Sequence, residues 1–176
     1  APDGQTLYVA DETANEVVVL ETASGRLQRR LTLPNPRGLV LSPDGGRLYV
    51  TSGEGDRLYR VETRSGKITG QAATGRQPVG LALTPDGRTL YCCCQFSDQV
   101  WVFDAATLVR KACLRAVREP RYASLTADGR LLAVANRLPL GSNLDEKLGA
   151  ELSVFDLAGG KHGTIKLASG ATDVGG

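Results

Sequence analysis

Two arginines are the residues of this sequence whose type and spacing best suit the binding of an anion. Arg37 and Arg121 each follow a proline, Pro36 and Pro120, at corresponding places in the chain. Guanidinium groups bind carboxylate and phosphate oxygens through two parallel hydrogen bonds, so two of them on one surface would clamp an anionic ligand. The alternative is that these arginines pair with neighbouring acidic residues or face solvent.

A long loop, residues 137–149, is the second candidate. It is about ten residues longer than the loops at corresponding positions, and long loops on a rigid frame often carry binding residues or tolerated insertions. We expect the loop and the two arginines to share one face, near a central channel. The sequence thus predicts no catalytic residues, and ligand- or partner-binding residues at Arg37, Arg121, Arg137, Asp145 and Glu146.

The four cysteines fit core packing better than metal binding, redox chemistry or haem attachment. Three are adjacent, at 92–94, and the fourth is Cys113. No Cys-x-x-Cys spacing occurs, so a zinc ribbon, a thioredoxin motif and c-type haem attachment are unsupported. We predict that the triplet acts as small apolar residues in the core. A disulfide to Cys113 would have to cross an intervening strand, beyond the usual Cα separation of roughly 4.4–6.8 Å.

The other ionisable candidates also have simpler structural interpretations. His162, the only histidine, lies in a glycine-rich hairpin turn where we expect it to be exposed, so haem ligation and a histidine-based metal site are unsupported. Asp56 and Asp98, with Glu16 near the same place, could bind a cation in a central channel. Their recurrence at one repeat position favours bonding to the turn backbone instead. We predict no metal and no cofactor.

The elements that position these residues recur about every 42 residues. Aspartates of Pro-Asp-Gly-type turns stand at Asp3, Asp44, Asp86 and Asp128, separated by 41, 42 and 42 residues. Such turns lie between short runs with apolar alternation of period two, which is typical of strands. Four strands per repeat of this length is the pattern of a propeller blade. The predicted fold is therefore all-β, a β-propeller of four-stranded antiparallel blades.

The repeats divide the chain into blades of approximately 1–35, 36–77, 78–119 and 120–171, with 172–176 starting a further blade. The first blade lacks its innermost strand. Because an open propeller exposes apolar faces and strand edges, we expect residues 1–176 to form a single but partial propeller. The alternative is a four-bladed ring closed by its own ends.

Residues 42–51, Ser-Pro-Asp-Gly-Gly-Arg-Leu-Tyr-Val-Thr, resemble the signature of the YVTN, or surface-layer-like, β-propeller repeat family. The resemblance covers nearly the whole chain. It departs at the cysteines 92–94 and at Ala133, which stands where tyrosine is expected. It implies a seven-bladed propeller. Residues 134–139 look, more loosely, like bacterial members associated with cytochrome c peroxidase-like modules.

The resemblance implies a non-catalytic binding scaffold on the bacterial cell surface or in the periplasm. Its partner would be a protein or a small anionic ligand on the channel face. The alternative is a propeller subunit or domain of an enzyme, lactonase-like or coupled to a cytochrome- or quinoprotein-type redox module. The net charge of +2 indicates no nucleic-acid partner, and no apolar run is long enough for membrane insertion.

Overall fold

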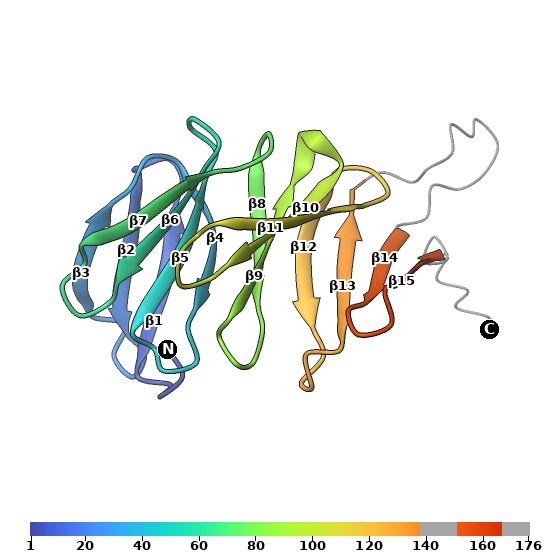
Figure 1. Ribbon diagram of the computed structural model, residues 1–176. Helices are drawn as coiled ribbons and strands as arrows, with labels where there is room; N and C mark the ends of the chain where they lie inside the picture. The colour runs from blue at the N-terminus through green and yellow to red at the C-terminus, as the bar shows by residue number, and fades with distance from the viewer. Residues whose placement is uncertain (138–150, 167–176) are drawn as a thin grey trace, which may run out of the picture.

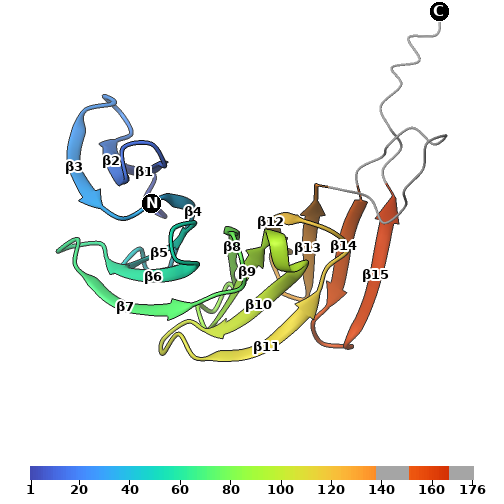
Figure 2. The same cartoon turned by 90° about the horizontal axis from the view of Figure 1, so that it is seen from above.

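The chain forms a row of antiparallel β-sheets that follow one another around an open arc (Figures 1 and 2). This computed structural model describes residues 1–137 and 151–166. Blade 1 has the strand order β1-β2-β3, blade 2 β4-β5-β6-β7, blade 3 β8-β9-β10-β11 and blade 4 β12-β13-β14-β15. The fold is thus β-propeller-like, as predicted, with four blades. The described residues do not close into a ring, so the four-bladed ring is not observed.

Each strand is six residues long, and one 3-10 turn interrupts the all-β pattern. The bounds are β1 (Thr6–Asp11), β2 (Glu16–Glu21), β3 (Leu27–Thr32), β4 (Pro36–Leu41), β5 (Arg47–Ser52), β6 (Arg57–Glu62), β7 (Ile68–Ala73), β8 (Pro78–Leu83), β9 (Thr89–Cys94), η1 (Gln95–Ser97), β10 (Gln99–Asp104), β11 (Arg110–Arg115), β12 (Pro120–Leu125), β13 (Leu131–Asn136), β14 (Glu151–Asp156) and β15 (Lys161–Lys166). In Figure 2, β4, β8 and β12 lie on the concave side of the arc, and β7, β11 and β15 lie on the convex side.

The repeated turns form one edge of the arc, which we call the turn edge; it is the lower edge in Figure 1. Asp44 accepts hydrogen bonds from Ser42 Oγ at 2.5 Å and from the Gly46 amide at 3.0 Å, and these bonds lower the pKa of its carboxyl. Asp86 and Asp128 make the same two bonds. The turn residues therefore fold the hairpins by local bonding, as their types predict.

The turns also hold neighbouring blades together. The turn glycines have a positive φ of 68° to 70°, and a Cβ atom at each would meet the Cδ of a proline from the preceding turn at 3.0 to 3.3 Å. The pairs are Gly45 with Pro2, Gly87 with Pro43, and Gly129 with Pro85. Glycine is thus required here by both conformation and close packing.

Alternation along the strands fills three apolar junctions between successive blades. In β5, Leu48 and Val50 pack toward blade 1, whereas Tyr49 packs toward blade 3. The Tyr49 hydroxyl donates to the Ala105 carbonyl of blade 3 at 2.9 Å. Thr51 accepts from the Gly38 amide and donates to the Val79 carbonyl, both at 2.7 Å. The junction between blades 2 and 3 therefore combines apolar burial with satisfied polar groups.

The backbones of the innermost strands approach closely near the channel. A Cβ atom at Gly38 would lie 1.8 Å from the Val79 carbonyl oxygen, and one at Gly80 would lie 2.3 Å from the Arg121 carbonyl oxygen. No side chain fits at either position unless the next blade moves away. The corresponding position of blade 4 holds Tyr122, which no further blade covers among the described residues and which is 68% exposed.

The cysteine triplet is buried in β9, as predicted. Cys93 packs between blades 3 and 4, and its two neighbours pack between blades 2 and 3. All four cysteines are free. Cys113 is exposed on β11, separated from Cys92 by Trp101 of β10 in the sheet register. Burial raises the pKa of the Cys93 thiol, which keeps it protonated and unreactive.

The recurring acidic residues bond to backbone, as their recurrence favoured. Asp56 and Asp98 have positive φ and accept hydrogen bonds from the amides of Gln77 and Glu119 at 2.7 and 2.8 Å. In blade 1 the equivalent residue is Asn15, which binds the Asn35 amide at 2.7 Å. Glu16, which the sequence grouped with them, instead pairs with Arg30. These side chains shape the connections between blades.

One placement from the sequence is wrong. His162 is exposed, but it lies within β15 rather than at a hairpin tip. Its ring stacks on Phe155 of β14, with 4.4 Å between ring centroids and 5° between planes. The register pairs these two residues directly, so the histidine covers an aromatic side chain at the convex rim.

Candidate functional site

A hollow of about 400 Å³ opens on the concave side of the arc. It is bounded by the first residues of β4, β8 and β12, together with the end of β1 and the residue that follows it. Its lining residues are Ala10, Glu12, Pro36, Arg37, Gly38, Leu39, Val79, Gly80, Leu81, Arg121, Tyr122 and Ala123. The hollow contains both proline-preceded arginines that the sequence singled out.

Arg37 is fixed by residues of blade 1 and of the connection that leads out of it. Its guanidinium donates to Glu12 Oε1 at 2.5 Å and to Asn35 Oδ1 at 3.2 Å. Asn35 Nδ2 also donates to Glu12 Oε1, at 3.3 Å. Arg37 is therefore paired with a neighbouring acidic residue, which was the alternative interpretation of the two arginines. Glu12 already offsets much of the positive charge of Arg37.

Arg121 differs from Arg37 in its surroundings. It is half-buried and lines the same hollow, but within residues 1–137 and 151–166 its side chain has neither an ion pair nor a hydrogen bond. The next residue, Tyr122, also lines the hollow and is 68% exposed. A guanidinium with free donors suits an oxyanion.

Arg137 lies at the edge opposite the turns, which we call the loop edge, where β5, β9 and β13 end. It is 3.4 Å from Glu119 Oε2, which also accepts from Gln95 Nε2 at 2.9 Å. Arg137 does not line the hollow. The structure thus groups Arg37 with Arg121 but leaves Arg137 in a separate network. Asp145 and Glu146 lie outside the described residues.

Sequence reasoning missed two residues of the hollow, Glu12 and Tyr122. Glu12 holds the repeat position of Gly53, Gln95 and Arg137, directly after the second strand of a blade. Extending the repeat register to this position would have placed it at the edge beside Arg37. At the repeat position of Tyr122, blades 2 and 3 have glycine, Gly38 and Gly80. The tyrosine is therefore a break in the repeat that the sequence alone could reveal.

The two arginines are the chemically distinctive residues of the hollow. Among the described residues, no group of three His, Cys, Asp or Glu side chains is placed to hold a metal ion. The described part of the chain also contains no helix long and apolar enough to cross a bilayer. Guanidinium groups bind carboxylate or phosphate. Among the described residues, Glu12 is the only carboxylate that lines the hollow, and it is already paired with Arg37.

Comparisons with known proteins identify the fold. No protein-family model matches the sequence, and no curated protein matches it. The chain is similar to the solved structure of Kuenenia stuttgartiensis hydrazine synthase, with a TM-score of 0.85 and 21% identity over 96% of this chain and 47% of that one. A functionally unknown protein from Desulfotomaculum acetoxidans DSM 771 has a TM-score of 0.74 and 13% identity, over 94% of this chain and 53% of that one. The chain spans about half the length of each.

Proposed function

We propose that this protein is a non-catalytic β-propeller scaffold that binds a small anionic ligand or an acidic protein segment in the hollow on its concave side. One observation carries the proposal: Arg121 lines the hollow without an ion pair among the described residues, whereas Arg37, which lines the same hollow from blade 2, is paired with Glu12. A half-buried guanidinium with unused donors gains more from an incoming oxyanion than one that is already paired.

The proposal also concerns the family of the propeller, its location and its number of blades. We infer membership of the YVTN repeat family from the motif at 42–51, with a location on the cell surface or in the periplasm as that resemblance implies. The four blades would then belong to a larger ring, for which the resemblance implies seven blades. The uncovered sheet faces at both ends of the arc support a larger ring.

The second candidate is a propeller subunit or domain of an enzyme, including a partner of a cytochrome-type module. The similarity to a solved hydrazine synthase structure favours it. Binding of a c-type cytochrome to the immobilised protein, measured by surface plasmon resonance, would support this candidate. Binding of small anions without any cytochrome response would support the scaffold.

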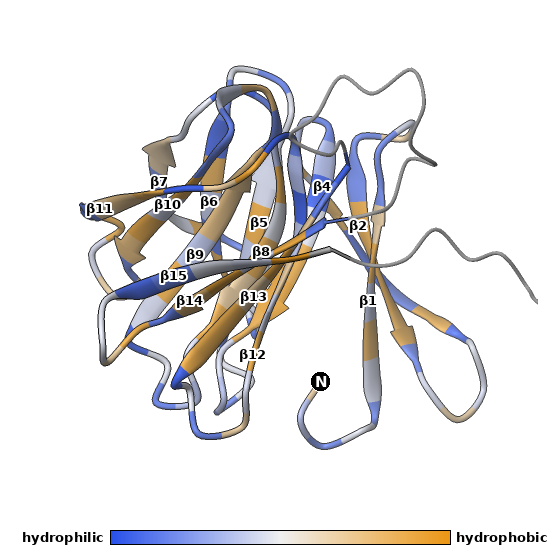
Figure 3. Ribbon diagram, turned by 90° about the vertical axis from the view of Figure 1, so that its right-hand side faces the viewer, coloured by the Kyte–Doolittle hydropathy of each residue, from blue (hydrophilic) through white to orange (hydrophobic). Residues whose placement is uncertain are grey.

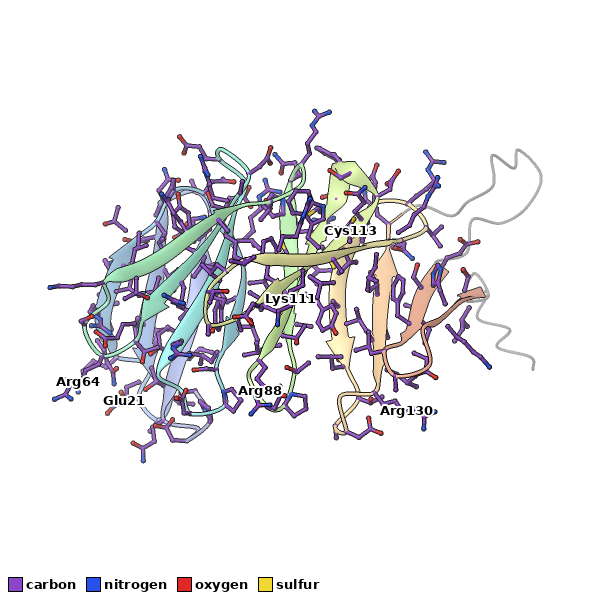
Figure 4. All side chains as sticks on the ribbon, viewed as in Figure 1. Glu21, Arg64, Arg88, Lys111, Cys113 and Arg130 are labelled. Atoms are coloured by element: carbon purple, nitrogen blue, oxygen red, sulfur yellow. The ribbon has the colours of Figure 1, made fainter. Side chains whose placement is uncertain are left out.

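The test of anion binding is calorimetric titration at low ionic strength with inorganic phosphate and, separately, succinate. A hydrogen bond to a charged group contributes about 1.5–3 kcal/mol, so Arg121→Ala should weaken binding at least tenfold. The double variant Glu12→Gln/Arg37→Ala should weaken it less, because it removes a guanidinium already engaged by Glu12 and leaves no unpaired carboxylate to repel the anion. Arg88→Ala is the matched control, since this exposed arginine lies at the turn edge (Figure 4).

Two results would overturn the proposal. One is the absence of any phosphate or succinate binding by the unmodified protein. The other is an Arg121→Ala variant that binds both anions as the unmodified protein does, because the ligand would then lie elsewhere.

A further inference from the structure

Blade 3 carries an exposed aromatic side chain at the loop edge. Phe96 lies in η1, which follows β9, and is 52% exposed. Among the described residues it packs in none of the three apolar junctions between blades. The corresponding residues of blades 1 and 2 are polar, Thr13 and Glu54. Figure 3 shows hydrophobic colouring mainly along the strands and hydrophilic colouring mainly in the connections, so a phenylalanine at this place departs from the pattern.

Arg76 is fixed against the turn that carries Phe96. The carbonyl of Arg76 accepts from the Phe96 amide at 3.2 Å, and its own amide donates to Ser97 Oγ at 2.8 Å. The side chain of Arg76 is exposed. The backbone bonds therefore hold an exposed guanidinium next to an exposed aromatic ring.

Arg118 lies on the other side of the same turn. It holds the repeat position of Arg76, in the next connection between blades, and it is also exposed. The amides of Ala116 and Glu119, which bracket it, bind the carbonyl and the side chain of Asp98 at 3.0 and 2.8 Å. Phe96 thus lies in a turn bound on both sides to connections that carry an arginine. We call Phe96, Arg76 and Arg118 the loop-edge patch.

The positive charge of the loop-edge patch is not offset. Within the part of the chain that the structure describes, neither arginine has an ion pair or a side-chain hydrogen bond. The adjacent acidic residues have other partners: Asp98 binds a backbone amide, and Glu119 accepts from Gln95 and pairs with Arg137. Aromatic residues and arginine are enriched at the centres of protein interfaces, where they contribute most of the binding energy.

The loop-edge patch adjoins the hollow on the concave side. The amide of Gln95 binds the Gln77 carbonyl, and its side chain donates to Glu119, both at 2.9 Å. Gln77 and Glu119 lie two residues before Val79 and Arg121, and both of these line the hollow. The turn of the patch is therefore fixed to the two connections that lead into the hollow.

We propose that the loop-edge patch binds an acidic protein segment in which carboxylate side chains flank one apolar side chain. The apolar side chain packs on Phe96, and the carboxylates pair with Arg76 and Arg118. A small inorganic anion has no group to pack on Phe96. The inference rests on the proposed function and names the partner as a protein segment, with a further carboxylate directed toward Arg121 in the hollow.

An extended segment can present all of these groups at once. Alternate side chains of an extended chain point to the same side. A pattern of acidic residues at every second position, with one apolar residue among them, therefore directs carboxylates and an apolar group to one surface.

Fluorescence polarisation with three labelled peptides at low ionic strength tests the proposal. The first peptide is Gly-Glu-Ser-Glu-Ser-Leu-Ser-Glu-Ser-Glu-Gly, the second replaces its leucine by glycine, and the third replaces each glutamate by glutamine. The first should bind with a dissociation constant below about 1 mM. The other two should each bind about tenfold more weakly, because each lacks one of the two kinds of contact.

Substitutions in the loop-edge patch should weaken binding of the first peptide. Phe96→Ala should weaken it about tenfold, to the level of the glycine peptide. Arg76→Ala and Arg118→Ala should each weaken it about three- to tenfold. The matched controls lie at the turn edge and should bind normally: Val109→Ala, whose side chain is 62% exposed, and Arg64→Ala (Figure 4). Circular dichroism should show each variant to be folded.

Four results would overturn the proposal. These are no binding of the leucine peptide at about 1 mM, equal binding of the leucine and glycine peptides, unchanged binding by Phe96→Ala, and tighter binding of a labelled oligothymidylate at the same patch. Calorimetry with phosphate reports on the hollow alone, and Phe96→Ala should leave it unchanged. Loss of the Phe96 effect with retained Arg121-dependent phosphate binding would refute the patch only. Phe96-dependent peptide binding without phosphate binding would refute the hollow only.

Discussion

Strands β1 and β5 have nearly the same sequence but opposite environments. Leu-Tyr-Val-Ala at residues 7–10 corresponds to Leu-Tyr-Val-Thr at 48–51, and both runs form the second strand position of a blade. Leu48 and Val50 are fully buried, whereas Leu7 and Val9 are exposed. Among the described residues, blade 2 has a blade before it and blade 1 does not. Local sequence thus sets the strand and its alternation, and the neighbouring blade sets the burial.

This comparison implies that the stability of the arc resides mainly in its junctions. In repeat architectures stability is approximately a sum of repeat and nearest-neighbour terms. Substitutions at equivalent positions should therefore cost very different amounts at inner junctions and at open faces. Unfolding of matched pairs of variants measures that difference.

The largest difference in the free energy of unfolding should come from substitution of a junction glycine. Gly38→Ala places a methyl group 1.8 Å from the Val79 carbonyl oxygen, so blade 3 must move away from blade 2. We expect destabilisation of about 4 kcal/mol or more, measured by urea unfolding. Gly163→Ala, in β15 with no atom within 4 Å of its Cβ position, is the control and should change stability by less than about 0.5 kcal/mol. Similar losses for both variants would contradict the importance of the junctions.

The second difference compares the same truncation in two equivalent strands. Leu48→Ala should cost about 3 kcal/mol, because it leaves a cavity in a junction. Leu7→Ala should cost under about 1 kcal/mol, because the side chain is already half in water. Urea midpoints at constant slope measure both. Equal losses would mean that the blade 1 face is buried in solution.

A smaller effect is expected for the hydroxyl that joins blades 2 and 3. Thr51→Val removes a hydrogen bond to the Val79 carbonyl and one from the Gly38 amide. We expect a loss of about 1–3 kcal/mol, since buried polar groups are left without partners. Thr32→Val, at an exposed position on β3, is the control. Calorimetric melting of the two variants would show the difference, and an unchanged melting temperature for Thr51→Val would argue against it.

Chemical modification of the cysteines should affect the fold least. It should also separate the exposed Cys113 from the buried cysteines 92–94 by their reactivity. Brief treatment with N-ethylmaleimide near neutral pH should modify Cys113 alone. The Cys92 thiol shares a side-chain hydrogen bond with Cys94, and that bond and burial raise the pKa of Cys92, while burial raises the pKa of Cys93. Cys94 is fully buried. Burial also raises the pKa of Cys113, so its reaction should be slow but visible by mass spectrometry. Rapid modification of the triplet in folded protein would show that the junctions open readily.

The repeat makes most of the fold predictable from the sequence. The Pro-Asp-Gly turns and period-two alternation predict the strands, because both are local properties. The junction partners are not local. The pairing of Glu12 with Arg37 requires two blades to be placed side by side, and the role of Gly38 is visible only once the Val79 carbonyl stands against it. The hollow could therefore be anticipated from its arginines, but its charge balance could not.

The two edges of the arc should tolerate insertion differently. At the turn edge, proline and glycine from successive turns are in contact, so added residues would separate blades. At the loop edge, the amides of Gly53, Gln95 and Arg137 bind the carbonyls of Asn35, Gln77 and Glu119, and these backbone bonds depend on no particular side chain. The longest excess of sequence follows Arg137 at this edge. Loop libraries for new recognition surfaces belong at the loop edge, where the scaffold already accepts variation in length.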